Sequence, residues 1–455
     1  MDLNPLFRPK SMAVIGVSLT NDRHPANVIY DKINLRYPVT VFPVNPKGGQ
    51  LHRNRVYKDV TEIPEPVDLA VIAARSKYVP AIIGGCIEKK VGGATIISGG
   101  FAEVGRQDLQ DEIVSMARAA ELPFIGPNCL GIYAPDRFDT FFLPGQRLIR
   151  PEPGNVAIIS QSGGVLVDQM VKFKAQGIGL SIGVSIGNKA LIREIDLLEY
   201  LAQDPGTRVI TFYVEGFGQG EGRTFVKAAH QCPKPVIVLK AGKTTAGSRA
   251  ASSHTASLAG DYAVFSQVLT QHCIAEAKSE YELLAFSEAL SCYQDAIDGR
   301  VGIITASGGH GVLAVDILSA QGLEVPPLSE SAQKDIFNRL DPSVQPIASV
   351  GNPVDLTGSA ADEDFIGAAI GMSRTPEVEC ILLLILPYSP SLSPELGARL
   401  SQIYQTEKKP MVAYVPHEDK YRMLIEGFEL NNIPVSDSVE GAALMVEALR
   451  RCQPC

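Results

Sequence analysis

The sequence lacks several features that would assign it to a common class of protein. It contains no tryptophan and few aromatic residues (7%), and its 41 Lys and Arg are outnumbered by 50 Asp and Glu, for a net charge of −9. A general nucleic-acid-binding protein needs a basic face, so no nucleic-acid partner is expected. The longest apolar run, 380–386, is far too short to cross a bilayer and is typical of a buried strand. The first residues also lack the pattern of a signal peptide, and no membrane association is expected.

Cysteine and nucleotide motifs are equally sparse. The eight cysteines are scattered, and only Cys452 and Cys455 form a Cys-x-x-Cys pair, at the end of the sequence. Without a second pair, this motif favours a frayed tail over a zinc or redox site, and we expect no metal site. Free thiols favour a reducing, cytoplasmic location. There is no GxGxxG fingerprint and no Walker-type loop, which argues against a nicotinamide dehydrogenase and a P-loop enzyme.

The chain does contain one repeated pattern: an apolar run, a turn of Gly, Ser, Asn or Pro, and a helix-like stretch. Strands that alternate with helices indicate parallel sheets covered on both faces, the α/β class. Three series of runs predict three Rossmann- or flavodoxin-like domains with mainly parallel sheets, over residues 1–140, 150–295 and 300–455. The expected strands are 12–17, 39–44, 68–74, 94–100 and 123–131, then 155–161, 179–187, 209–216 and 234–242, and last 301–309, 323–328, 379–387, 409–416 and 433–436.

Polar, Gly-rich loops follow the strands of the first series. Ligands of parallel α/β sheets bind beyond the carboxyl ends of the strands, where these loops gather. A lone glycine at a strand end is more often a tight turn, so ordinary turns stay the alternative for each loop. As a set with one cation, the loops are typical of a site for a nucleotide with phosphates. The candidate residues are Gly16, Val17, Ser18, Asn45, Lys47, Ala73, Ser98, Gly99, Gly100 and Asn128.

A second candidate site lies where the run 155–161 leads into a helical pattern. Two serines and two glycines at this junction would direct hydroxyl and first-turn N–H groups at an anion, helped by the helix dipole. The alternative is a plain serine N-cap, which needs fewer such residues. We favour anion binding by Ser160, Gln161, Ser162, Gly163 and Gly164.

His254 stands in a run of small residues, with no large apolar side chain within three positions on either side. A core histidine normally packs among large apolar residues, and a metal ligand has a second ligand at short spacing. Neutral imidazole is available near pH 7, so this setting predicts a nucleophile on a slim, mobile loop that accepts a group and carries it. Simple solvent exposure is the alternative.

Glu215 directly follows the apolar run 209–214. A carboxylate buried at the end of a strand needs a cation or an N–H group as its partner. Glu215 could hold the His254 ring in one tautomer, or equally pair with a nearby Lys or Arg. In the last domain, 307–311 and 351–358 repeat the turn theme. His310 could be a second functional imidazole, although we expect a turn residue.

Together these motifs resemble the alpha subunit of ADP-forming acetyl-CoA synthetase, of the superfamily that includes succinyl-CoA synthetase. The resemblance implies a CoA-binding first domain, a second domain that carries a phosphohistidine, and a third domain that packs the subunit together. The matching stretches run through the chain in order: 9–16, 43–47, 126–131, 159–163, 196–200, 213–216, 252–260 and 351–358.

The resemblance also implies the reaction and its residues. Acyl-CoA, ADP and phosphate would be converted reversibly to a carboxylic acid, ATP and CoA, through an acyl phosphate and a phosphohistidine. His254 would be that histidine, Glu215 the carboxylate that orients it, 160–164 the phosphate cradle, and Gly16, Ser18, Lys47 and 98–100 contacts to coenzyme A. Because the chain lacks an ATP-grasp region, a separate ATP-grasp beta subunit would bind ADP or ATP with Mg, in an alpha2beta2 hetero-oligomer.

Three stretches depart from the family pattern. Residues 19–27 lack the glycines usual in the CoA loop, 187–194 has apolar and basic residues where an acidic one is common, and His310 replaces a usual proline. Two alternatives therefore stay open. A non-catalytic CoA-binding or regulatory protein would bind CoA without phosphorylation, and an acyl- or carbamoyl-transferring relative would form product without a nucleotide.

Overall fold

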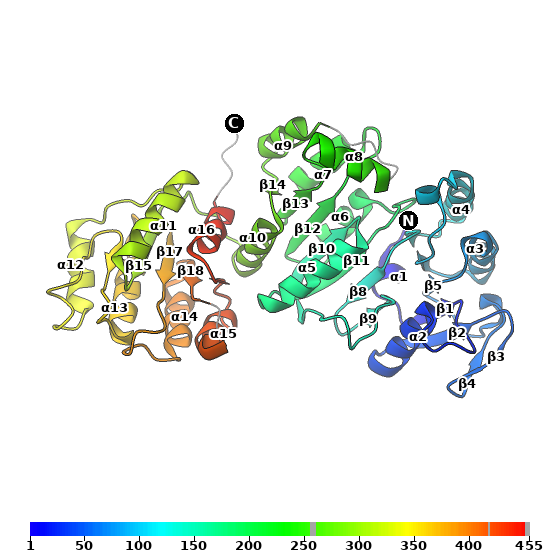
Figure 1. Cartoon of the computed structure of the whole chain (residues 1–455), viewed down its shortest axis with the longest axis horizontal. Helices are drawn as coiled ribbons and strands as arrows, with labels where there is room; N and C mark the ends of the chain where they lie inside the picture. The colour runs from blue at the N-terminus through cyan, green and yellow to red at the C-terminus, as the bar shows by residue number, and fades with distance from the viewer. Residues whose placement is uncertain (255–260, 417–418, 451–455) are drawn as a thin grey trace. The chain divides into compact units, whose positions relative to one another are not determined.

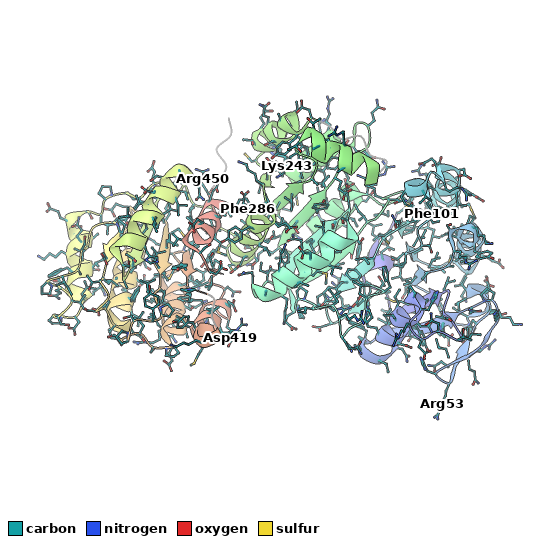
Figure 2. The ribbon with its side chains drawn as sticks, viewed as in Figure 1. Arg53, Phe101, Lys243, Phe286, Asp419 and Arg450 are labelled. Atoms are coloured by element: carbon teal, nitrogen blue, oxygen red, sulfur yellow. The ribbon has the colours of Figure 1, made fainter. Side chains whose placement is uncertain are left out.

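The computed structural model describes residues 1–254, 261–416 and 419–450, without the side chains of 251–254. It divides into two compact units, Met1–Lys278 and Ser279–Cys455. Each unit is built on mainly parallel sheets with helices between the strands, so the predicted α/β class is confirmed (Figure 1). Side chains fill the space between helices and sheets within each unit (Figure 2). Within the described residues, no helix has the length and apolar character needed to cross a membrane.

The first sheet has five parallel strands in the order β2-β1-β5-β6-β7. Alternate residues of β1 enter two apolar clusters, Met12 and Val14 on one face and Ala13 and Ile15 on the other. Because the strand order reverses beside β1, the loops after β1 and β5 flank the usual ligand crevice of such sheets. The elements are α1 Asn4–Phe7, β1 Ser11–Ile15, α2 Pro25–Arg36, β2 Thr40–Val44, β3 Gly49–Leu51, β4 Asn54–Val56, β5 Leu69–Ile72, α3 Val79–Lys89, β6 Gly93–Ile96, α4 Gln107–Ala119 and β7 Phe124–Ile125.

The second sheet of the first unit has seven strands in the order β14-β13-β12-β10-β11-β8-β9. Its β8 and β9 come from 131–139, inside the predicted first domain, and β8 pairs antiparallel with β11. The predicted boundary at residue 140 therefore separates two strands from the sheet that they extend. The elements are β8 Gly131–Ala134, β9 Phe138–Asp139, β10 Pro153–Ser160, α5 Gly163–Ala175, β11 Leu180–Ser185, α6 Glu194–Gln203, β12 Val209–Val214, α7 Glu221–Gln231, β13 Val236–Lys240, α8 Thr245–His254, α9 Tyr262–Gln271 and β14 Ala275–Ala277.

The second unit has five parallel strands in the order β16-β15-β17-β18-β19. The expected strand 323–328 is wrong: only Glu324 forms an isolated bridge, because Pro326 and Pro327 have no N–H for a ladder. The elements are α10 Glu280–Cys292, β15 Val301–Thr305, α11 Gly308–Ala320, α12 Glu330–Arg339, β16 Val354–Asp355, α13 Asp362–Ser373, β17 Cys380–Leu384, α14 Leu396–Glu407, β18 Met411–Tyr414, α15 Arg422–Glu429, β19 Val435–Ser436 and α16 Val439–Ala448.

Helix α10 belongs to this second unit, although the sequence placed it before the boundary at 295–300. Its buried Glu288 accepts a hydrogen bond from the N–H of Val435 on β19 (2.8 Å). Just beyond the helix, the hydroxyl of Tyr293 accepts from the N–H of Met411 on β18 (3.1 Å). Burial raises the pKa of Glu288 well above its ordinary value, since only one backbone N–H opposes the loss of water.

Candidate functional site

The loops after β1 and β5 meet at the carboxyl edge of the first sheet. Gly16 has a φ of +105°, and a Cβ at this position would lie 2.5 Å from the carbonyl oxygen of Ala73. Only glycine adopts this conformation and permits this approach. Two predicted contact residues thus lie side by side in the crevice, and the close packing already requires the glycine.

The loop after β1 is held by two amide side chains. Asn27 accepts a hydrogen bond from the N–H of Ser18 (2.6 Å) and donates one to its carbonyl oxygen (2.8 Å). Asn45 donates to the carbonyl of Val17 (2.6 Å). Sequence reasoning missed Asn27, which is fully buried in the first turn of α2. The sequence signal that could have identified Asn27 is an amide among the apolar residues of that helix. The Asn27 side chain holds the loop after β1 in place.

Lys47 is the cation of this edge. Its side chain is exposed, and its backbone N–H donates to Asn45 Oδ1 (2.9 Å). Hydrogen bonds already order the backbone of this loop. The exposed ammonium can therefore bind a phosphate with little further loss of backbone entropy. The predicted residues 16–18, 45, 47 and 73 therefore gather on one edge.

The side chain of Glu103 binds backbone N–H groups of the loop after β6. Its carboxylate accepts hydrogen bonds from the N–H groups of Gly100 (2.5 Å) and Phe101 (3.2 Å) and from the amide of Asn188 (2.6 Å). Burial opposes ionisation, but these hydrogen bonds together hold the pKa of Glu103 below its ordinary value. The N–H of Gly100, predicted to contact a ligand, is thus already bound within the chain.

The other residues of this loop join the loop after β7. The N–H of Asn128 donates to the carbonyl of Ser98 (2.9 Å), and the hydroxyl of Ser98 accepts from the N–H of Ala74 (3.2 Å). A Cβ on exposed Gly99 would lie 3.2 Å from Asn128 Oδ1. Ser98, Gly99 and Asn128 therefore form one surface with the loop after β5.

The predicted anion cradle joins β10 to α5. The hydroxyl of Ser160 donates to the carbonyl of Ser162 (2.6 Å) and accepts from its N–H (3.1 Å). Ser162 caps α5 through the N–H of Val165 (3.4 Å), as the plain-cap alternative requires. Within the described chain, however, the N–H groups of Gly163 and Gly164 find no acceptor, and Gly164 is exposed. Two open donors at a helix start fit an anion.

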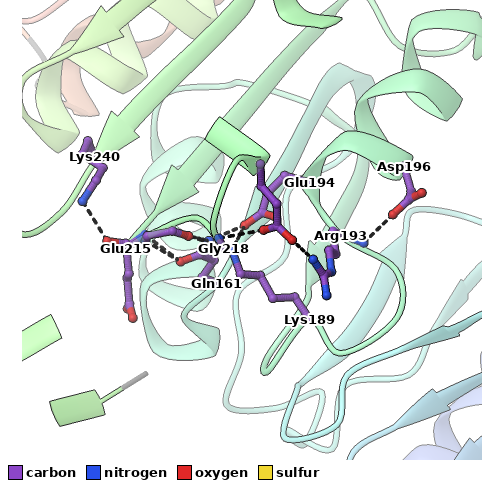
Figure 3. A network of polar contacts seen from close by, with 10 residues as sticks. Gln161, Lys189, Arg193, Glu194, Asp196, Glu215, Gly218 and Lys240 are labelled. Carbon is purple, nitrogen blue, oxygen red and sulfur yellow. Dashed lines mark hydrogen bonds and ion pairs between the residues drawn. The ribbon is translucent and has the colours of Figure 1, made fainter. Parts of the chain in front are cut away.

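Gln161 has a different position from the one predicted. Its buried side chain turns away from the helix start and contacts the turn after β12. Its amide oxygen accepts from the N–H groups of Glu215 (2.7 Å) and Gly216 (3.2 Å). The side chain thus connects the anion cradle to the Glu215 turn instead of lining the cradle (Figure 3).

Glu215 is 7% exposed and follows β12, as its sequence position suggested. The ammonium of Lys240, the last residue of β13, donates to the backbone carbonyl of Glu215 (2.7 Å). Burial lowers the pKa of Lys240 more than the attraction of Glu215 raises it. The backbone of Glu215 is thus held on two sides, by Gln161 after β10 and by Lys240 at the end of β13.

His254 ends α8, so the segment before it is helical and the predicted loop is wrong over 245–254. Thr244 caps this helix, because its hydroxyl accepts from the N–H of Gly247 (3.0 Å) and its carbonyl from Ser248 (2.7 Å). Small Ala and Ser residues form a helix as readily as a loop. The His254 side chain and residues 255–260 lie outside the described part, as does the Cys452–Cys455 pair.

A cavity of about 1040 Å³ begins at Gly216, next to Glu215, and lies between α7 and α9. Its walls are mostly apolar, with Phe217, Val264 and Phe265, and the cations Arg223 and Lys227 stand one helical turn apart on α7. The cavity thus adjoins the turn that carries Glu215, and Gly216 and Lys240 belong both to its lining and to the polar network.

The second unit repeats the geometry of the anion cradle. Thr305, at the end of β15, donates to the carbonyl of Ser307 (3.0 Å) and accepts from its N–H (3.0 Å). His310 lies in the first turn of α11, with Nδ1 3.1 Å from the hydroxyl of Ser307 and its ring stacked on Tyr414. No group of three His, Cys, Asp or Glu side chains within the described ranges could hold a metal ion.

Comparisons with known proteins agree with this arrangement. The model of a CoA binding domain matches residues 10–135, and that of a succinyl-CoA ligase like flavodoxin domain matches 153–290. The alpha subunit of ADP-forming acetate–CoA ligase I from Pyrococcus furiosus is 36% identical over 99% of this chain and 97% of its own length. The chain belongs to the family of ADP-forming acetyl-CoA synthetase alpha subunits. The resemblance seen in the motifs is confirmed.

Other members of the ADP-forming acetyl-CoA synthetase family extend the match. The structure of Ca. Korarchaeum cryptofilum dinucleotide forming acetyl-coenzyme A synthetase 1, in complex with phosphate and ADP, has a TM-score of 0.90 and 31% identity, covering 98% of this chain and 96% of that chain. ADP-forming acetate–CoA ligase I of Archaeoglobus fulgidus is 38% identical over 84% of this chain, which spans 54% of that longer relative. The match thus spans about half the length of this longer relative.

Proposed function

We propose that this chain is the alpha subunit of an ADP-forming acid–CoA ligase. The reaction converts acyl-CoA, ADP and phosphate to a carboxylic acid, ATP and CoA. Phosphate displaces CoA from the acyl group to give an acyl phosphate, and the phosphoryl group then passes to His254 and on to ADP. Full-length similarity to an ADP-forming acetate–CoA ligase alpha subunit is the observation that carries this proposal.

The edge of the first sheet supports the role of coenzyme A as substrate. Gly16 and Ser18 follow β1, Lys47 follows β2, and Ser98, Gly99 and Asn128 follow β6 and β7, so all of them lie at the carboxyl ends of strands of this sheet. The exposed ammonium of Lys47 suits a ligand that carries phosphates. Gly16 and Gly100 also have structural roles, in the close packing of the loops and in the hydrogen bond to Glu103. Their presence is therefore no separate support for a CoA site.

The second sheet supplies the groups for phosphoryl transfer. The open N–H groups of Gly163 and Gly164 hold an anion at the start of α5, and Glu215 follows the strand next to β10. Both lie at the carboxyl edge of the same sheet, as does Lys240 before α8. Glu215 keeps the imidazole of His254 in the tautomer that presents a nucleophilic nitrogen.

A separate beta subunit with an ATP-grasp fold binds ADP or ATP with Mg, and the two subunits form an alpha2beta2 assembly in the cytoplasm. This part of the proposal is supported by the longer relative, of which the chain spans about half. It is also supported by the word subunit in the names of two full-length relatives.

The test combines the chain with its ATP-grasp partner, acetyl-CoA, ADP and radioactive phosphate. We expect ATP formation and an acid-labile label on this chain. His254→Ala is expected to abolish the label and leave CoA binding nearly intact. Absence of ATP with every common acyl-CoA, or a label that survives His254→Ala, contradicts the proposal. CoA binding without any label would support a non-catalytic protein, and product without nucleotide would support a transferase.

A further inference from the structure

The side chain of Gln161 uses its complete hydrogen-bonding capacity inside the protein. Its amide nitrogen donates to Glu194 Oε1 and to the carbonyl of Gly216 (2.8 Å). Its amide oxygen accepts from the N–H groups of Glu215 (2.7 Å) and Gly216 (3.2 Å). An amide has two donors and one oxygen with two lone pairs, so no further bond can form. The N–H groups of both peptides around Glu215 are therefore bound by one side chain.

Glu194 and Lys189 support Gln161 from the stretch 187–194 that departs from the family pattern. Glu194 is 1% exposed, and its Oε1 lies 2.8 Å from the ammonium of Lys189. Lys189 also donates to the carbonyl of Gly216 (2.7 Å) and lies over the ring of Phe217, 5.3 Å from its centroid. A buried carboxylate between an amide and an ammonium is satisfied, and it fixes the direction of the Gln161 amide (Figure 3).

The position of Gln161 in the chain makes this network significant for catalysis. It lies between Ser160 and Ser162, whose hydroxyl and N–H groups build the start of α5. The same residue therefore belongs to the phosphate cradle through its backbone and to the Glu215 turn through its side chain. A change in its amide moves the carboxylate relative to the cradle, and small displacements of reacting groups slow group transfer strongly.

We propose that Gln161, Glu194 and Lys189 form a buried positioning unit that sets Glu215 relative to the phosphate cradle during phosphoryl transfer. The side chain of Gln161 would act through the Glu215 turn that it binds, so its role is that of a positioning residue. The proposal rests on the proposed function for the step that it affects. Its geometric part, control of the Glu215 turn, stands on the hydrogen bonds of the unliganded chain.

An exchange of amide and carboxylate tests the unit. Gln161→Glu keeps the shape but places a second carboxylate against Glu194, while Glu194→Gln removes the charge that receives the amide. In the double variant the amide at 194 donates to the carboxylate at 161, and Lys189 keeps its bond to the carbonyl of Gly216. The double variant therefore restores a donor and an acceptor between 161 and 194. Gln161→Glu destroys this pairing, whereas Glu194→Gln only weakens it, because an amide oxygen at 194 still accepts.

The measurement is the rate of label transfer from radioactive phosphate in the complete complex with acetyl-CoA, at pH 6 to 8. We expect Gln161→Glu to slow labelling about 100-fold at pH 8 and Glu194→Gln about 10-fold. The double variant is expected to recover to within about 10-fold of the wild type, a non-additive result. Additive losses, or labelling by Gln161→Glu at the wild-type rate, would overturn the proposal.

The pH profile separates positioning from a loss of folding. In Gln161→Glu the neighbouring carboxyl groups share a proton at low pH and repel each other at high pH. The ratio of the variant rate to the wild-type rate is therefore expected to rise as the pH falls. The other charged groups near the turn are Lys189, Glu215, Lys240, Arg193 and Glu221. A pH-independent ratio would contradict the unit. CoA affinity should match the wild type, and an unfolding transition above the assay temperature shows that the variant remains folded, although its midpoint is expected to fall because the two buried carboxylates repel each other.

Hydrogen exchange gives a readout that does not depend on turnover. The amides of Glu215 and Gly216 are expected to exchange faster in Gln161→Glu and to return to wild-type protection in the double variant. If the wild-type complex takes no label, the proposed function fails while these amides still test the unit. Unchanged protection in Gln161→Glu would overturn the control of the turn itself.

Discussion

Lys32 and Asp139 form an ion pair between two sheets of the first unit. The ammonium lies 2.8 Å from Asp139 Oδ1, and the side chains are 5% and 0% exposed. Lys32 belongs to α2 of the first sheet, whereas Asp139 ends β9 at the edge of the second. Asp139 also pairs with Arg150 (2.6 Å) and accepts from the N–H of Phe141 (2.8 Å). The buried carboxylate therefore has partners from several segments, and Lys32 is the one that links the sheets.

Lys32→Met is expected to lower the free energy of unfolding by about 3 kcal/mol, because it leaves a buried carboxylate with fewer partners. Denaturant unfolding of the purified chain measures this loss. The control is Lys174→Met, which breaks an exposed pair with Glu152 and should cost less than about 1 kcal/mol. Equal costs for the two variants would show that the buried pair does not hold the sheets together.

The same pair predicts a pH dependence. Burial lowers the pKa of Lys32 to about 8, against the opposing attraction of Asp139. In the unfolded chain a lysine keeps a pKa of about 10.4. Between these values the unfolded chain binds more protons, so the contribution of Lys32 to the free energy of unfolding rises with pH. The stability difference between wild type and Lys32→Met should therefore grow from pH 7.5 to 10, and a constant or shrinking difference contradicts this assignment.

The long parallel strands could be predicted from the sequence because strands buried on both faces are continuous apolar runs. The short strands β8, β9, β14 and β16 were not predicted, because two to four residues are too few to form a recognisable apolar run. Helix α8 was not predicted either, since a helix of Ala and Ser shows no apolar face. Pairing of β8 with β11 depends on contacts between segments far apart in the chain, so the sequence did not show that β8 extends the second sheet.

The candidate site was predictable where the rule of carboxyl strand ends applies. Gly16 and Ala73 adjoin as expected, because parallel strands bring their loops to one edge. Asn27, Glu103 and the role of Gln161 were not predictable, since each depends on a partner that only the fold brings near. Glu103 meets Asn188 across 85 positions of sequence. Local motifs thus identify the loops, and tertiary contacts decide which groups in them remain open for a ligand.

Gly16→Ala is expected to destabilise the first unit by about 3 kcal/mol or more and to weaken CoA binding. The backbone has a φ of +105°, and the added Cβ would lie 2.5 Å from the carbonyl oxygen of Ala73, so the β1 and β5 loops must separate. Thermal unfolding and calorimetric CoA titration measure the two effects.

Gly105→Ala is the matched control for this change. Its φ is +81°, but a Cβ there has nothing within 4 Å, so only the backbone conformation is affected. We expect a loss of about 1 kcal/mol and unchanged CoA affinity. If Gly16→Ala behaves like this control, close approach of the two loops is not what requires the glycine.

Glu215→Gln separates the carboxylate from the turn that carries it. Its N–H donates to Gln161 (2.7 Å) and its carbonyl accepts from Lys240 (2.7 Å), and both contacts survive because they involve the backbone. The fold and CoA affinity are therefore expected to stay as in the wild type. The rate of His254 labelling by radioactive phosphate should fall on the order of a thousandfold, because an amide no longer holds the imidazole in the reactive tautomer and no longer stabilises its cation. Labelling at the wild-type rate would remove Glu215 from the reaction and leave it a structural residue at the end of β12.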